Sequence, residues 1–223
     1  MKKIILTGSE GLIGKSLYSH LSLSHNVFCM DYLKGDDLSN PEYVNDIFKK
    51  EKGDVLINCF AKNHHIDKDG NSSNRFMDIS LDSFNQYLNA NLTSLFSVCR
   101  EYIRNNKEGN IINFGSLYSI VSPRKDLYNG DEKHIGYSVS KAGVIMLTKH
   151  IATHFSPNFR ANTIILGGVS YNQSEGFKDL YNKNVPMGRM MDVSEVNSAV
   201  DFAINNTYIN GSEIIVDGGW TAI

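Results

Sequence analysis

The sequence lacks a surplus of basic residues and any long apolar run. Its 22 basic and 24 acidic residues give a formal net charge of -2, whereas binding to nucleic acid or an anionic membrane requires a basic face. No stretch approaches the roughly 20 apolar residues of a membrane span. The first apolar run stops at Thr7-Gly8, too early for a signal peptide. We therefore expect a cytoplasmic protein with neither nucleic acid nor a membrane as its partner.

Cysteine is also scarce. Cys29, Cys59 and Cys99 are widely separated, odd in number and form no Cys-x-x-Cys pair, which is the spacing that redox and metal motifs use. Cys29 and Cys59 fall in apolar runs that read as strands. We expect three reduced, buried thiols.

The histidines form no recognisable metal site. His64-His65 has no third ligand at a suitable spacing, and the polar segment 62–80 around it is long enough for a lid or a subunit contact. His150 and His154 are four apart, but Ile151 stands where the zinc-protease pattern requires Glu. We expect no bound metal, with both of these histidines on a helix surface.

Short apolar runs alternate with amphipathic segments throughout the 223 residues, a length that suits one domain with a sizeable core. This alternation predicts a single α/β domain over residues 1–223, with a doubly wound parallel sheet of about seven strands and helices on both faces. The predicted strands are 3–6, 26–30, 54–60, 109–114, 160–166 and 212–216, with an edge strand at 36–38. The predicted helices are 12–23, 41–52, 81–105, 135–154 and 194–205, while 170–190 is predicted to be irregular.

Three glycines follow the first strand and open a helix. Gly8 allows a tight turn, Gly11 lets the backbone approach a pyrophosphate, and Gly14 lets the helix pack closely on the sheet. The helix N-terminus then offers unpaired amides to the phosphates. The alternative is a glycine-rich turn without a ligand. The predicted cofactor-binding turn also contains Ser9, Glu10, Leu12 and Ile13.

An acidic residue, Asp31, ends the second strand, 23 residues after Gly8. A carboxylate there can accept hydrogen bonds from the ribose hydroxyls of adenosine. It would also repel a 2′-phosphate, so it favours NAD(H) over NADP(H), and Glu10 points the same way. Lys34 argues against this preference, because a cation can hold that phosphate. The alternative is that Asp31 is a turn residue at a strand end.

Tyr137 and Lys141 are four residues apart in a predicted helix, and therefore on one face of it. An ammonium beside a phenol favours the phenolate, which makes the tyrosine usable as a proton donor and acceptor. The alternative is a tyrosine packed against a lysine stem.

Asn58 and Ala61 lie at the carboxyl end of a strand, where parallel sheets bind ligands. Asn91 lies among apolar residues of a helix and requires polar partners.

Taken together, these residues resemble the short-chain dehydrogenase/reductase family over the full length of the chain. That family has a single-domain Rossmann fold. The resemblance rests on motifs that occur in the family's order: Thr7-Gly8-x-x-Gly11-x-x-Gly14, Asp37-Leu38, Asn58-x-x-Ala61, Asn91, Ser116, Tyr137-x-x-x-Lys141, Asn162, Gly167-Gly168 and Asp217-Gly218-Gly219.

The resemblance implies a catalytic set. Tyr137 would be the general acid and base, and Lys141 would hold the nicotinamide ribose and lower the pKa of Tyr137. Ser116 would hydrogen-bond the substrate oxygen, and Asn91 would organise a water that relays protons. The cofactor-binding residues implied in addition to the glycine turn and Asp31 are Asp37, Leu38, Asn58, Ala61, Tyr137, Lys141, Gly167, Gly168 and Val169.

The chain also departs from the family pattern. The spacing of Gly11 and Gly14 is that of the longer, sugar-nucleotide-modifying branch, whereas the second half matches the shorter branch. The family's Asn-Asn-Ala-Gly signature is reduced here, and Leu166 stands where the family has Pro. An insertion ahead of Tyr137 would roof the substrate site with Tyr118, Arg124, Tyr128 and Asn129.

The segments 118–136 and 166–191 look most like members found with surface-polysaccharide and sialic-acid-like sugar biosynthesis. The resemblance implies reversible hydride transfer between nicotinamide and a secondary alcohol or ketone, on a polar sugar that is free or nucleotide-linked. Two alternatives stay open: an NAD-dependent epimerase or dehydratase that uses the same Tyr and Lys, and a cofactor-binding regulator without chemistry. Family members assemble through the helices at 82–105 and 135–155, which implies a homodimer or homotetramer.

Overall fold

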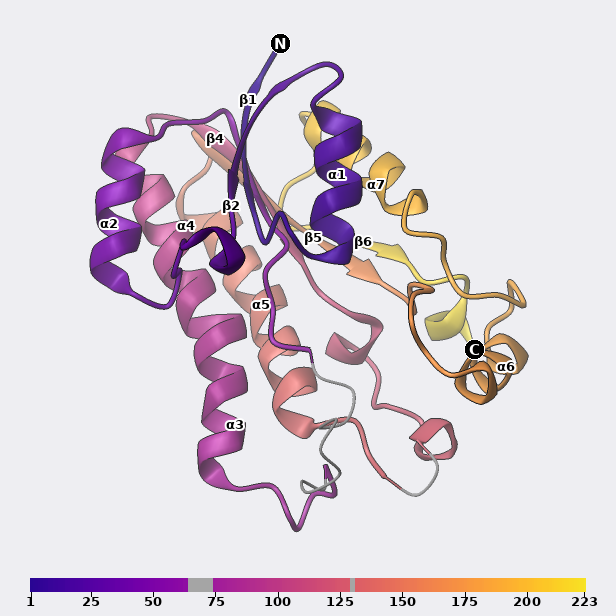
Figure 1. Cartoon of the computed structure of the whole chain (residues 1–223). Coiled ribbons are helices and arrows are strands. Elements are labelled where there is room, and N and C mark those ends of the chain that lie inside the picture. Colours follow the sequence, from indigo (N-terminus) through magenta and orange to yellow (C-terminus); the bar gives the residue numbers. More distant parts are fainter. Residues whose placement is uncertain (64–73, 129–130) are drawn as a thin grey trace.

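The computed structural model describes residues 1–63, 74–128 and 131–223. Within these ranges, six parallel strands form one sheet in the order β2-β1-β3-β4-β5-β6 (Figure 1). The strands are β1 (Lys3–Thr7), β2 (Asn26–Met30), β3 (Val55–Asn58), β4 (Gly109–Phe114), β5 (Phe159–Leu166) and β6 (Glu213–Val216). The helices are α1 (Leu12–Leu21), α2 (Pro41–Lys50), α3 (Leu81–Leu88), α4 (Ser94–Asn105), α5 (Ile135–His154), α6 (Glu175–Asn184) and α7 (Glu195–Asn205). The predicted α/β class with a doubly wound parallel sheet is confirmed.

Helices cover both faces of the sheet, with α1 and α7 on one face and α2, α4 and α5 on the other (Figure 1). Successive side chains of a strand point to opposite faces. In β1, Ile4 and Leu6 therefore join the core under α1 and α7, and Ile5 joins the core under α2, α4 and α5. All three side chains are fully buried. The apolar runs seen in the sequence are thus strands buried on both faces, which is typical of parallel sheets.

The winding of the chain reverses between β1 and β3. The chain first adds β2 on one side of β1 and then returns to place β3 on the other side. Thr7, at the carboxyl end of β1, is in register with both Met30 and Asn58. In an open parallel sheet, the crevice outside the strand ends at such a reversal is where ligands bind. The fold thus places the glycine turn, which begins at Gly8, at this crevice.

The predicted edge strand at 36–38 is wrong, and the sheet has six strands rather than about seven within the described residues. Instead of extending, the chain makes a 3-10 turn at Tyr32–Lys34 and continues through Gly35 at a φ of 92°. The Asp36 carboxylate accepts the backbone N–H of Asp31 at 2.8 Å and the hydroxyl of Tyr43. These bonds fold the segment back on itself, so it does not pair with β2.

Two helical predictions also need correction. The segment 170–190, predicted to be irregular, contains α6, whose N-terminus is capped by Ser174 accepting from the N–H of Phe177 at 3.3 Å. The long helix predicted at 81–105 is divided into α3 and α4 by a π-helical turn at Asn89–Thr93. The prediction that α5 spans 135–154 is confirmed.

The cysteines are free thiols, as expected, but they are not all buried. Cys99 is buried, whereas Cys29 and Cys59 are partly exposed at the strand ends near the crevice. His64 and His65, together with Asn129, lie outside the described residues. Among the helices of the described part of the chain, we find none with the length and apolar character that crossing a membrane requires.

Candidate active site and cofactor groove

A groove of about 450 Å³ lies at the carboxyl ends of β1, β2 and β3. It is formed by the glycine turn, the segment that follows β2 and the segment that follows β3. Its lining contains seven of the residues predicted to bind the cofactor: Gly8, Glu10, Gly11, Asp31, Asp37, Leu38 and Ala61. The structure therefore brings these residues together from three parts of the chain.

The three positions of the turn are occupied by glycine for different physical reasons. Gly8 has a φ of 71°, and a Cβ on it would lie 2.4 Å from the backbone nitrogen of Phe60. A Cβ on Gly14 would lie 2.1 Å from the carbonyl oxygen of Gly8. Both glycines are therefore required by the fold itself.

Gly11 is different because the protein does not require it to be glycine. It is exposed on the groove, and the nearest atom to an added Cβ is the Gly8 carbonyl oxygen at 3.4 Å, an ordinary contact. Its missing side chain leaves open space in front of the N-terminus of α1, where backbone amides face outward. That space fits the close approach of a dinucleotide pyrophosphate.

Acidic residues mark the end of the groove at β2. Asp31 is buried and accepts the backbone N–H groups of Glu10 and Leu33, each at 2.9 Å. The carboxylate of Glu10 pairs with Lys34 at 2.8 Å and with Lys15 at 3.6 Å. The hydrogen bond with Lys34 lowers the pKa of Glu10. The charge of Lys34, which argued for NADP(H) at the level of sequence, is thus paired with an acid.

The other predicted residues on this side differ in their exposure to the groove. Leu38 is buried in the core next to it, and Asp37 folds its carboxylate onto Ser39, accepting from the backbone N–H at 3.0 Å and the hydroxyl at 2.6 Å. Asn58 points into the sheet: its amide donates to Asn113 at 2.8 Å and accepts from the Thr7 hydroxyl at 3.0 Å. Asn58 therefore joins three strands beneath the groove. Ser9 is buried, and Leu12, Ile13 and Gly14 form the first turn of α1.

Ser116 and Tyr137 converge at the carboxyl end of β4. Ser116 follows β4 and opens a 3-10 turn, in which its Oγ accepts the N–H of Tyr118 at 3.2 Å. Tyr137 comes from the first turn of α5, and its phenol is buried. Burial raises the pKa of Tyr137, and the nearby hydroxyl of Ser116 lowers it. The structure therefore brings these two predicted site residues close together.

Lys141 lies one helical turn after Tyr137 and is buried. Its Nζ donates to the carbonyl of Phe114, the last residue of β4, at 2.7 Å. Burial lowers the pKa of Lys141 to about 8. The resemblance implied that Lys141 lowers the pKa of Tyr137. In the structure the nearby Ser116 lowers the pKa of Tyr137 and the ammonium of Lys141 ties α5 to β4, so the effect of Lys141 on Tyr137 stays a prediction.

Asn91 lies inside the π-helical turn and fixes the segment that follows β3. Its side-chain carbonyl accepts the N–H of Lys62 at 2.6 Å, and its amide donates to the Lys62 carbonyl at 3.1 Å and to Ser140 Oγ at 3.0 Å. Ser140 in turn donates to the carbonyl of Tyr137 at 2.8 Å. Asn91 thereby connects the groove wall to the helix that carries the tyrosine. The partners that its buried position requires are present.

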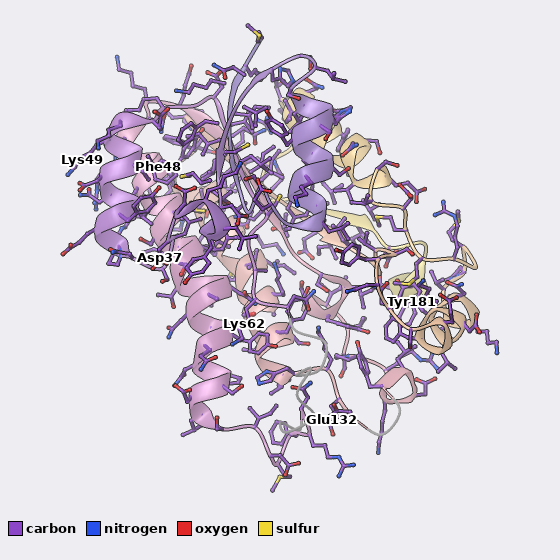
Figure 2. All side chains as sticks on the ribbon, viewed as in Figure 1. Asp37, Phe48, Lys49, Lys62, Glu132 and Tyr181 are labelled. Atoms are coloured by element: carbon purple, nitrogen blue, oxygen red, sulfur yellow. The ribbon has the colours of Figure 1, made fainter. Side chains whose placement is uncertain are left out.

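Gly167 and Gly168 follow β5 and border a smaller cavity of about 190 Å³ together with Tyr181 and Asp217, and Val169, the next residue, pairs with Met191 as an isolated bridge. The N–H of Gly168 donates to the Tyr181 hydroxyl at 2.6 Å. In Figure 2, Tyr181 lies on α6, and Lys62 lies near α3 and α5. Gly167 and Gly168 are thus on the α6 side of the strand ends, separate from the groove at β1 and β2.

A third apolar cluster covers this side of the site, with Tyr181 stacked on Trp220 at 4.7 Å between ring centroids. It includes Tyr128, whose hydroxyl donates to that of Tyr118 at 2.9 Å. The predicted role of this insertion as a roof of the substrate site agrees with this position. The buried residues of the cluster are Leu117, Leu127, Tyr128, Tyr181, Val185, Met190 and Trp220.

Sequence reasoning missed Lys133, which is buried against the ring of Tyr137. The sequence offered no signal for this burial, because Lys133 is a charged residue that precedes α5. Within the part of the chain that the structure describes, no group of three or more His, Cys, Asp or Glu residues is arranged to hold a metal ion. His150 and His154 stack on each other on the surface of α5.

Comparison with known proteins agrees with this architecture. A family model described as enoyl-(acyl carrier protein) reductase matches residues 34–221. A short-chain dehydrogenase from Leptospira borgpetersenii, solved with bound NAD+, superposes with a TM-score of 0.87 at 30% identity, covering 99% of this chain and 92% of that one.

Two curated bacterial proteins are similar over nearly their whole length. The post-translational flagellin modification protein A of Campylobacter coli is 27% identical, over 98% of each chain. A 3-oxoacyl-[acyl-carrier-protein] reductase of Buchnera aphidicola is 28% identical, over 98% of this chain and 97% of the relative. The chain belongs to the short-chain dehydrogenase/reductase family and is an NAD(P)-dependent oxidoreductase that acts on CH–OH groups.

Proposed function

We propose that the protein catalyses reversible hydride transfer between NAD(H) and a secondary alcohol or ketone of a polar sugar. The observation that carries the proposal is the approach of Ser116 to the buried phenol of Tyr137 at the carboxyl end of β4, with Lys141 one helical turn further along α5. The nicotinamide supplies or accepts the hydride when it is bound. The protein then has to bind the two reactants and manage one proton.

Tyr137 is the proposed proton donor and acceptor. In reduction its phenol gives a proton to the oxygen that develops negative charge, while the Ser116 hydroxyl donates a hydrogen bond to the same oxygen. In oxidation the proton returns to the phenolate. Because burial raises the pKa of Tyr137, the phenolate needs a nearby cation. We assign this role, and that of holding a ribose hydroxyl, to the buried ammonium of Lys141.

The remaining predicted residues are proposed to bind the cofactor. Gly8 and Gly11 admit the pyrophosphate at the start of α1, and Leu38 and Ala61 border the adenine end of the groove. Asp31 and Glu10 favour the ribose of NAD(H), because two acids at this end disfavour a 2′-phosphate.

The proposed substrate is a polar sugar, free or nucleotide-linked. The paired hydroxyls of Tyr118 and Tyr128 give the roof of the site hydrogen-bonding capacity inside an apolar cluster. The name of the Campylobacter coli relative, a flagellin modification protein, supports a substrate used to modify a surface protein.

We also infer a cytoplasmic homodimer or homotetramer assembled through α3, α4 and α5, as is usual in the family. Large apolar side chains are exposed on these helices, among them Phe96 on α4 and Met146 on α5. Their burial in an assembly would remove apolar surface from water.

Replacing Tyr137 with Phe tests the proposal. The variant should lose turnover by about 100-fold or more and keep its affinity for NADH, measured by nicotinamide fluorescence. Tyr208→Phe, which alters a fully exposed tyrosine, is the matched control. Full activity in Tyr137→Phe would refute the assignment. Cofactor retained through purification, with no net change in nicotinamide absorbance, would favour an epimerase or dehydratase. Bound NADH without turnover on a panel of ketones and sugars would favour a regulator.

A further inference from the structure

Lys133 is a buried lysine that has no acidic partner among the described residues. It lies just before α5, four residues ahead of Tyr137, and is only 5% exposed. Lysine is almost never fully buried unless it is paired, because removing an ammonium from water is costly. None of the ion pairs among the described residues includes Lys133. A buried charge of this kind requires an explanation.

The contacts of Lys133 place its side chain beside the ring of Tyr137. Its Nζ lies 4.5 Å from the centroid of the Tyr137 ring and donates to Asn63 Oδ1 at 2.5 Å. An ammonium has three N–H donors, and a contact with a ring face uses its charge rather than a hydrogen bond. Within the part of the chain that the structure describes, two donors of Lys133 are therefore left for another acceptor close to the phenol.

The carboxylates next to Lys133 in sequence are engaged elsewhere. Asp131 accepts the backbone N–H of Asn74 at 3.2 Å, and Glu132 accepts that of Phe76 at 3.2 Å. Figure 2 shows Glu132 at the end of the molecule beyond the start of α5. The charges of Lys133 and Lys62 lower the pKa of His134, an effect added to that of its burial. This part of the site therefore has a positive potential that no described acid neutralises.

We propose that Lys133 recognises an anionic group of the substrate, a carboxylate or a phosphate carried near the carbon that Tyr137 and Ser116 act on. This inference rests on the proposed function of that site. In a poorly solvated position the attraction between opposite charges is much stronger than in water. A neutral analogue would leave the buried donors unpaired, so the site would reject it.

A role in recognition and a purely structural role predict opposite effects on stability when Lys133 is replaced. A buried charge without a partner opposes folding, and an apolar side chain of similar length removes that penalty. Lys133→Met should therefore melt at the same temperature as the wild type or higher, while it loses recognition of the anion. A lysine kept for the fold would destabilise the protein when it is replaced.

The test is anion binding to the NADH-loaded protein, followed by nicotinamide fluorescence. The small probes are acetate and inorganic phosphate, and the ring probes are glucuronate and glucose 6-phosphate, with glucose as the neutral control. The wild type should bind at least one anion about tenfold more tightly than glucose, and Lys133→Met should lose that difference. Lys149→Met, which removes a surface lysine paired with Glu213, should bind as the wild type does. Tighter binding of acetate and glucuronate would identify a carboxylate as the recognised group, and tighter binding of inorganic phosphate and glucose 6-phosphate would identify a phosphate.

Two results would overturn the proposal: a wild type that binds neither anion better than glucose, or a Lys133→Met variant that binds the anion with unchanged affinity. If Lys133→Met does not fold, Lys133→Gln takes its place, because it keeps hydrogen-bond donors and removes the charge. The same loss of anion binding is expected for it. NADH affinity is measured first for every variant. Absence of NADH binding in the wild type would refute the proposed function, whereas normal NADH binding without anion selectivity would refute only the role of Lys133.

Discussion

The carboxylate of Asp31 accepts the backbone N–H of Glu10 at 2.9 Å and thereby joins the end of β2 to the glycine turn. Its second oxygen accepts the N–H of Leu33, and Glu10 in turn holds Lys34. One buried acid therefore sets the shape of the groove end and also contributes its negative charge. The proposed recognition of the cofactor and the local structure are therefore coupled at this residue.

We expect Asp31→Asn to shift the cofactor preference. The amide oxygen can still accept one backbone N–H, so the loss of stability should be about 1 kcal/mol. The variant removes the charge that opposes a 2′-phosphate, so the ratio of NADPH to NADH affinity should rise about tenfold. A tenfold change corresponds to a modest part of the Coulomb energy between two charges that lie close together. Fluorescence titration of both cofactors measures the ratio. Asp46→Asn, which alters an exposed acid on α2, serves as the control. An unchanged ratio would show that Asp31 does not set the preference.

The glycines of the turn should separate folding from cofactor binding. Gly14→Ala places a methyl group 2.1 Å from the Gly8 carbonyl, so it should lower the free energy of unfolding by about 1–3 kcal/mol. Gly11→Ala meets only an ordinary contact. It should change stability by less than about 1 kcal/mol and weaken NADH binding about tenfold, because the methyl group occupies the place where a pyrophosphate would lie.

Urea unfolding and NADH titration on the same preparations distinguish these effects. Gly176→Ala is the matched control, because no atom lies within 4 Å of the added carbon and its φ is ordinary. If Gly11→Ala bound NADH as tightly as the wild type, the pyrophosphate would have to lie elsewhere, and the cofactor-binding role of the glycine turn would be lost.

Local pattern was sufficient to predict much of the sheet. The bounds of β2 and β4 were predicted to the residue, because each is an apolar run that ends at a polar residue or a glycine. The same is true of the placement of Tyr137 and Lys141 on one face of α5, since helical spacing alone puts them there. These features depend on neighbours in sequence and hence are visible without a structure.

Features that depend on distant contacts were not predictable. The π-helical turn around Asn91 adds no recognisable period to its helix. The segment of α6 looked irregular because Pro186 and Gly188 follow it closely. Lys133 is a charged residue in a loop and reads as exposed; its burial results from packing against the Tyr137 ring and Asn63. The third cluster likewise forms from residues that are far apart in the chain.

The pH dependence of stability should reveal the buried lysine. Burial lowers the pKa of Lys133 to about 7, from an ordinary value of 10.5. Between these values the unfolded chain binds more protons than the folded one, so this lysine makes the free energy of unfolding rise with pH, by at most about 1.4 kcal/mol per pH unit. Below about pH 7 Lys133 is protonated in both the folded and the unfolded chain, so the destabilisation by its buried charge has its full value.

Lys141 acts in the same direction above about pH 8. Burial raises the pKa of the thiols of Cys59 and Cys99, and this effect lowers the free energy of unfolding at alkaline pH.

These other groups are present in both proteins when the wild type is compared with Lys133→Met, so their effects cancel in the difference. Lys133→Met should be more stable than the wild type at pH 7 by a few kcal/mol, because it removes the charge whose pKa burial lowers from 10.5 to about 7. The lost contact with the Tyr137 ring reduces this gain by about 1–2 kcal/mol. The advantage should shrink steadily as the pH rises to 9. Urea unfolding at pH 7, 8 and 9 measures it. A difference that does not change with pH would mean that Lys133 keeps its ordinary pKa in the folded protein and is well solvated, which would also remove the basis for its proposed recognition of an anion.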